Sequence, residues 1–190
     1  MYNNWYDLKS DCGTCRKCHL GETRTNLVFG VGNENAEVML IGEGPGEQED
    51  LQGEPFVGKS GQLLDKYLAA IDLDRNKNVY IANIVKCRPP HNRDPKPEEQ
   101  DACISWLKEQ TRLIHPKIIV CVGRIAAQRL MDPNFRVTKQ HGEFINRNGF
   151  LMMGTFHPAA LLRNPSQKPD AFEDFLALRE KIKETCENTY

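Results

Sequence analysis

The feature that most constrains the fold is an alternation of short, β-branched apolar runs with longer amphipathic segments. The runs at 37–42, 79–85, 117–122 and 150–153 have the length and composition of buried strands. The spacing of apolar residues predicts helices over 61–71, 98–114, 123–130 and 172–185. This order predicts an α/β protein, a three-layer α/β/α fold with a central, mostly parallel four-stranded sheet.

The length and composition indicate one domain. A chain of 190 residues, 39% of them hydrophobic, fits a single domain over 1–190 with a cysteine-bearing N-terminal arm of about 1–36. No run approaches the roughly 18 apolar residues of a membrane span, so we expect a cytoplasmic protein without membrane contact, and a monomer. The net charge of -1 excludes a protein that coats nucleic acid by charge alone.

The cysteine spacing predicts a metal site. Cys12, Cys15 and Cys18 form a C-x2-C-x2-C run, and fifteen residues separate the distant Cys87 and Cys103. Two neighbouring and two distant thiolates can close a four-ligand site that ties the arm to the centre of the chain. Spacing alone leaves Cys12 or Cys18 as the spare cysteine, and it fits zinc as well as a [4Fe-4S] cluster.

Two glycine motifs resemble nucleotide-binding loops. Residues 53–60 match the P-loop pattern G-x4-G-K-[ST], but an acidic stretch precedes them where a buried strand is required. Gly42, Gly44 and Gly46 after a strand resemble a dinucleotide fingerprint, but Glu47 occupies the position where the third glycine is required. We therefore expect neither motif to bind a nucleotide, and a nucleotide triphosphatase is a minor alternative.

The ends of the predicted strands hold residues that suit a flat ring with polar edges. Glu43 and Glu49 follow the first strand, Asn83 lies in the second and His157 follows the last, with Phe56 in a nearby loop. Sites in parallel sheets lie at such ends. An aromatic ring can stack on a base, a carboxamide can pair with a donor and an acceptor on its edge, and a neutral histidine can donate to a carbonyl.

Two of these residues suit the cleavage of a bond between a pyrimidine and its sugar. That reaction leaves negative charge on the base, notably on O2, and positive charge on the sugar. His157 can donate at O2, and the Glu43 carboxylate can lie near the sugar. Separately, a histidine before proline is more often structural and an acidic loop residue is usually only solvated, so the combination carries the interpretation.

An apolar tip and a cation follow His157. A leucine at such a tip can fill the gap that a flipped nucleotide leaves in the base stack, and an arginine can bind a phosphate. Leu161, Leu162 and Arg163 are the candidates. Either leucine could instead pack in the core, and we expect this less of Leu161 than of Leu162.

Taken together, the motifs resemble the uracil-DNA glycosylase superfamily, specifically its iron–sulfur family, family 4. The resemblance spans about residues 12 to 180. The matching segments are Cys15-x2-Cys18, Thr23-Arg24 through Phe29-Gly30, Gly42 to Glu47, Pro55 to Lys59, Asn83 to Pro90, and His157 to Pro165.

The resemblance implies a structural [4Fe-4S] cluster, with zinc as the less favoured metal. Its ligands would be Cys15, Cys18, Cys87 and Cys103, which leaves Cys12 as the spare cysteine.

The resemblance also assigns roles at the site. Phe56 would stack on uracil, Asn83 would read it, His157 would lie near O2 and Leu161 would intercalate. The full set of expected substrate-binding residues is Gly42, Glu43, Gly44, Glu49, Phe56, Asn83 and His157.

This sequence departs from the best-known branch of the superfamily, where the first motif has an aspartate that activates water and a tyrosine that excludes the thymine methyl. Gly44 and Gly46 occupy those positions. Glu43, with Asn92 as a hydrogen-bonding partner, and Glu49 would compensate. We expect a monofunctional uracil-DNA glycosylase that acts on uracil-containing DNA in base excision repair. The alternative is a non-catalytic iron–sulfur protein of the same fold that binds DNA or senses damage.

Overall fold

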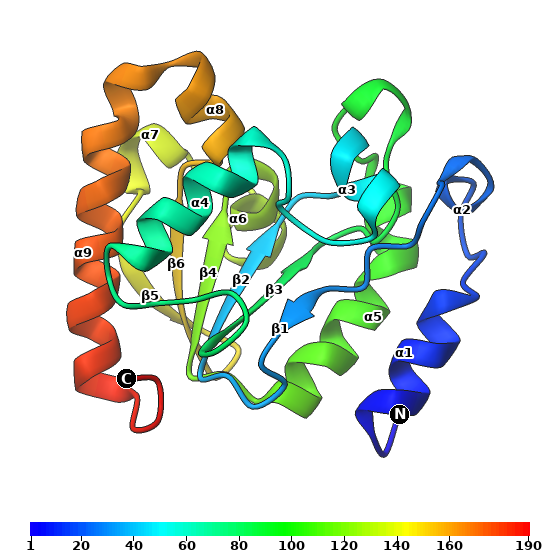
Figure 1. Cartoon of the computed structure of the whole chain (residues 1–190), viewed down its shortest axis with the longest axis horizontal. Helices are drawn as coiled ribbons and strands as arrows, with labels where there is room; N and C mark the ends of the chain where they lie inside the picture. Colours follow the sequence, from blue (N-terminus) through cyan, green and yellow to red (C-terminus); the bar gives the residue numbers. More distant parts are fainter.

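The computed structural model covers residues 1–190 and has three layers, with a sheet between two groups of helices (Figure 1). The sheet has six strands in the order β1-β3-β2-β4-β6-β5. Their bounds are Val31–Gly32 (β1), Val38–Gly42 (β2), Val79–Asn83 (β3), Ile118–Val122 (β4), Phe144–Arg147 (β5) and Phe150–Thr155 (β6). The α/β class is therefore confirmed.

The expected four-stranded parallel sheet forms the centre, and the strand count was too low by two. β3, β2, β4 and β6 are parallel neighbours, whereas β1 and β5 pair antiparallel at the two edges. β1 has only two residues, and β5 is largely exposed, so neither has the apolar run of a buried strand. Asn148 and Gly149 form the turn that joins β5 to β6, and both residues have the positive φ that a tight hairpin turn requires.

The helices divide between the two faces of the sheet (Figure 1). Residues of α1, α5 and α6 share one apolar core, and residues of α4, α8 and α9 share the other. None of the helices combines the length and the hydropathy that a membrane span requires. The helices are α1 (Trp5–Gly13), α2 (Leu20–Thr23), α3 (Glu47–Gln52), α4 (Lys59–Ala69), α5 (Pro97–Ile114), α6 (Arg124–Leu130), α7 (Val137–Gln140), α8 (Pro158–Arg163) and α9 (Lys168–Thr185), with short 3-10 helices η1 (Pro90–Asn92) and η2 (Pro165–Gln167).

The N-terminal arm packs directly on the rest of the chain. Leu8 and Cys12 of α1 are fully buried in the same core as Trp106 and Leu107 of α5. The arm also supplies β1, whose Val31 pairs with Ile81 of β3. The arm is thus joined to both the sheet and a core helix.

The parallel register brings the strand ends together. Gly42 at the end of β2 pairs with Asn83 at the end of β3, and Val122 of β4 pairs with Thr155 of β6. Because these strands run in one direction, the loops that follow them open at the same edge of the sheet.

Candidate active site

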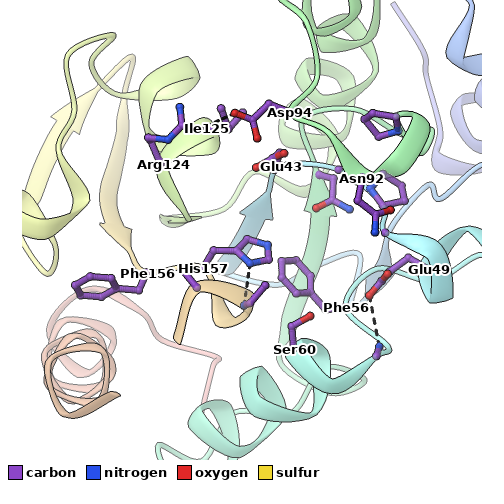
Figure 2. A pocket seen from close by; sticks show the side chains of 18 of the residues that line it. Glu43, Glu49, Phe56, Ser60, Asn92, Asp94, Arg124, Ile125, Phe156 and His157 are labelled. Carbon is purple, nitrogen blue, oxygen red and sulfur yellow. Dashed lines mark hydrogen bonds and ion pairs between the residues drawn. The ribbon is translucent and has the colours of Figure 1, made fainter. Parts of the chain in front are cut away.

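A cavity of about 620 Å³ opens at this edge. It collects most of the side chains that the sequence singled out: Glu43, Gly44, Glu49, Phe56, Asn83, His157 and Arg163 all line it. The Phe56 and His157 rings lie with centroids 5.5 Å apart, inclined by 31°. Figure 2 shows the Phe56 ring beside the His157 imidazole, with Glu49 on the opposite side of Phe56.

Gly42 serves this cavity without lining it. A Cβ atom at Gly42 would lie 2.5 Å from Asn83 Oδ1 and 2.6 Å from Phe56 Cζ. Both distances are shorter than real side-chain contacts, so any larger residue would displace one of the two groups. Gly42 thus lets a carboxamide and an aromatic ring meet at the end of β2.

The Asn83 side chain is buried in the cavity with an unpaired hydrogen-bond acceptor. The side chain is only 2% exposed, and its Oδ1 is the one buried side-chain nitrogen or oxygen in the chain without a hydrogen-bond partner. Leaving such an atom unpaired costs free energy that binding of a donor recovers. Asn83 is therefore poised to accept a hydrogen bond from a ligand in the cavity.

His157 is held as a neutral donor. Its Nδ1 accepts a hydrogen bond from the Ala159 backbone N–H at 3.1 Å. Because an amide N–H can only donate, Nδ1 carries no proton and the ring proton is on Nε2. Burial, together with the charge of Arg163, lowers the pKa of His157 to about 4, and the Glu49 carboxylate opposes this only in part.

The pKa of Glu43 is shifted in the opposite direction. Burial and the nearby Asp94 carboxylate raise the pKa of Glu43 to about 7, although the Arg124 guanidinium lowers it. Arg124 also forms an ion pair with Asp94 at 2.7 Å. Figure 2 shows the Glu43 carboxylate below Asp94, with Arg124 to one side and Asn92 to the other.

The expected pairing of Asn92 with Glu43 is absent. Asn92 lines the cavity, but its Oδ1 accepts a hydrogen bond from Arg88 Nε at 2.7 Å, and no hydrogen bond joins it to Glu43. Asn92 and its neighbour His91 both have positive φ, so a tight loop conformation directs this carboxamide. The charged neighbours of Glu43 are Asp94 and Arg124 instead.

Glu49 organises the loop that carries Phe56. Its Oε1 accepts from the backbone N–H groups of Val57 at 3.2 Å and Gly58 at 3.4 Å. These amides belong to the stretch that matches a P-loop, and a carboxylate of the chain already occupies them. The stretch also follows helix α3, not a strand, so the argument against a P-loop agrees with the fold.

The two candidate leucines lie next to each other in α8 but differ in burial. Leu161 is 1% exposed and packs in the core, whereas Leu162 is 41% exposed. The expectation that Leu161 is the less buried leucine was wrong. Consecutive helical residues point about 100° apart, and in α8 it is Leu161 that faces the core shared with α4 and α9. Arg163 is exposed next to Leu162.

Three charged residues that line the cavity, Arg93, Asp94 and Arg124, were missed by sequence reasoning. Arg124 directly follows Gly123 at the end of β4, so the strand-end rule that found Asn83 would have found it too. Asp94 lies in an irregular loop after η1, and nothing in the local sequence marks it.

The four expected ligand cysteines gather away from this cavity. Cys15, Cys18, Cys87 and Cys103 line one small hollow between the arm and α5, and Cys12 does not line it. Three of these sulfurs receive an N–H donor: Arg24 Nη1 to Cys87 at 3.1 Å, Trp106 Nε1 to Cys15 at 3.3 Å, and the Lys86 backbone to Cys103 at 3.3 Å. Such donors are typical of the surroundings of thiolate ligands.

The structure has no group of three or more His, Cys, Asp or Glu side chains placed to hold a single metal ion. The four cysteines around this hollow form a cluster of sulfurs that joins the arm to α5.

The comparisons with known proteins agree with this geometry. The family model described as the uracil DNA glycosylase superfamily matches residues 29–179. The chain is 45% identical to a type-4 uracil-DNA glycosylase of Archaeoglobus fulgidus, over 95% of this chain and 92% of that relative. It is 42% identical to one of Sulfurisphaera tokodaii, over 91% and 82%, and 45% identical to one of Thermotoga maritima, over 81% of each.

Proposed function

This chain belongs to the uracil DNA glycosylase superfamily, and on that premise we propose that it removes uracil from DNA by hydrolysing the N-glycosidic bond. The product is an abasic site, the starting point of base excision repair. A base inside a duplex is not accessible to a cavity of this kind, so the deoxyuridine enters after flipping out of the base stack.

The observation that carries this proposal is the unpaired Asn83 Oδ1 beside the Phe56 ring. The uracil edge offers N3–H as a donor and O4 as an acceptor. Asn83 matches that pair with Oδ1 and Nδ2, and stacking on Phe56 holds the ring in the plane that both bonds need. Cytosine presents the reverse pattern and leaves the carboxamide mismatched.

His157 and Glu43 supply the chemistry. As the bond to the sugar breaks, charge builds up on O2, and the Nε2–H of neutral His157 donates to it. The pKa of about 4 makes His157 a hydrogen-bond donor and not a source of a full proton at neutral pH. The Glu43 carboxylate stabilises the positive sugar or orients the attacking water, and it acts when ionised.

The exposed end of α8 supports DNA binding. Leu162 is the leucine that can enter the base stack, and the Arg163 guanidinium beside it can bind a phosphate. We therefore propose that Leu162, rather than Leu161, is the residue that intercalates.

Cys15, Cys18, Cys87 and Cys103 would hold a [4Fe-4S] cluster. Bound there, the cluster would tie the arm to the segment after β3 and to α5, and it would take no part in bond cleavage. The support is the set of four sulfurs around one hollow and the N–H donors to three of them.

The direct test is incubation with a uracil-containing oligonucleotide, followed by alkali, which cleaves the strand at abasic sites. We expect Asn83→Asp to lower kcat/KM by about 100-fold or more, because a carboxylate cannot donate to O4 and leaves a buried charge unpaired. The matched control is Asn146→Asp, an exposed asparagine in β5.

Equal activity in Asn83→Asp would contradict Asn83 as the group that reads uracil. A wild-type protein that binds DNA but forms no abasic sites would instead support a non-catalytic or damage-sensing role.

A further inference from the structure

Phe56, the residue proposed to stack on the base, has an unusual backbone conformation. Its φ is +53°, in the left-handed region that bulky side chains rarely adopt. Such a conformation persists only when the surrounding structure holds it. The ring itself is 5% exposed and lies beside Gly42 and His157.

Arg75, in the loop between α4 and β3, holds this backbone from outside the cavity. Its Nη1 donates to the Pro55 carbonyl at 3.0 Å, and its Nη2 donates to the Phe56 carbonyl at 2.6 Å. The third bond runs from Nε to Asp65 Oδ1 at 2.8 Å. One guanidinium therefore binds both carbonyl groups that flank the left-handed residue.

Helix α4 closes the other side of the same peptide. A Cβ atom at Gly61 would overlap the Phe56 carbonyl, so the first turn of α4 is pressed against it. The Phe56 carbonyl is thus fixed between Gly61 and the Arg75 fork, and the ring direction follows from the backbone.

Arginine is needed here for its shape. Its planar fork can donate to two carbonyls at once, whereas a lysine ammonium is a single point of charge on a flexible stem. The Arg75 side chain is 13% exposed, so its donors are held among fixed partners, while the Asp65 side chain is 46% exposed and contributes less.

We propose that Arg75 is a positioning residue for uracil recognition: by binding the Pro55 and Phe56 carbonyls, it fixes the ring on which the base stacks. This inference rests on the proposed uracil-DNA glycosylase function. Arg75 does not line the cavity, so it acts only through Phe56.

The test is a double-mutant cycle with Arg75→Met and Phe56→Ala, assayed on a single-stranded uracil oligonucleotide and by inhibition with free uracil. Loss of an ordered stacking partner weakens base binding by about tenfold, so we expect Arg75→Met to raise KM and the uracil inhibition constant by that factor. We expect kcat to change less, because a stacked ring binds the base alike before and during the reaction.

The cycle separates positioning from a general role in folding. In the Phe56→Ala background, Arg75→Met should add less than about a twofold effect, because the ring that it positions is gone. Equal factors in both backgrounds, or an unchanged KM in Arg75→Met, would overturn the proposal.

Two further variants guard against a folding defect. Arg75→Lys keeps the charge near Asp65 but cannot hold both carbonyls, so we expect the same rise in KM, and wild-type KM in this variant would also overturn the proposal. Asp65→Asn keeps both carbonyl bonds and should leave KM within about twofold of wild type. If wild type released no uracil, the proposed function would fail first, which is a separate outcome.

Discussion

His157 and Glu43 share one cavity, and burial shifts their pKa values in opposite directions. It lowers the pKa of His157 to about 4, because the imidazolium loses its water, and it raises the pKa of Glu43 to about 7, because the carboxylate does. Near neutral pH the histidine is therefore uncharged, while the glutamate changes charge. Of these two groups, only Glu43 changes charge in this range.

We expect uracil excision to rise as pH increases over roughly pH 6 to 8 and then to level off, because the ionised carboxylate is the active form. The raised pKa of about 7 sets this window, and His157 remains neutral across it. Measurement of kcat/KM against pH checks this for wild type and Glu43→Gln. The variant should be slower and nearly flat over the window, and an unchanged rise in Glu43→Gln would assign the titration to another group.

At the scale of elements, α8 performs two tasks with adjacent residues. Leu161 joins the core formed with α4 and α9, and Leu162 projects to solvent. His157 stands at the N-terminus of the same helix, where the Ala159 N–H sets its tautomer. Under the proposed function, this one short helix and its N-cap residue would provide both the donor to O2 and a DNA contact.

The two leucines should differ when each is replaced by alanine. We expect Leu161→Ala to lower the free energy of unfolding by about 2–5 kcal/mol, as buried leucines do. We expect Leu162→Ala to leave stability nearly unchanged but to slow excision from double-stranded DNA by about tenfold, with a smaller effect on single strands that have no stack to fill. Denaturant unfolding and excision assays on both substrates measure these effects, and the reverse assignment would restore Leu161 as the wedge.

At the scale of the whole molecule, the cysteine site joins parts of the chain that are far apart in sequence. Cys15 and Cys18 belong to the arm, Cys87 follows β3 and Cys103 lies in α5. Closing so long a loop constrains the unfolded chain, so a group held here stabilises the whole fold.

We expect Cys87→Ala to lose the brown visible absorbance and bound iron and to lower Tm, because one of four thiolates is removed. Cys12→Ala should keep both iron and absorbance, with a loss of only about 1 kcal/mol for the smaller buried side chain. Metal analysis and thermal unfolding provide the measurements. Zinc in place of iron, or loss of iron in Cys12→Ala but not in Cys18→Ala, would contradict the assigned ligand set.

The sequence alone determined the central architecture and the types of residue at the site. Buried parallel strands such as β2 and β3 are continuous apolar runs, which is a local signal, and the ends of these runs locate Glu43 and Asn83. The edge strands β1 and β5 were not predicted, because an exposed or two-residue strand has no continuous apolar run.

Which side chains face one another depended on how the elements pack in three dimensions. Leu161 rather than Leu162 is buried, Glu43 lies beside Asp94 rather than bonding Asn92, and Arg75 reaches Phe56 from nineteen residues along the chain. Each outcome depends on what distant elements place around a group, since burial and charge act through space. The local sequence is enough to predict residue types and strand ends. Contacts between side chains and shifts of pKa depend on how the layers pack.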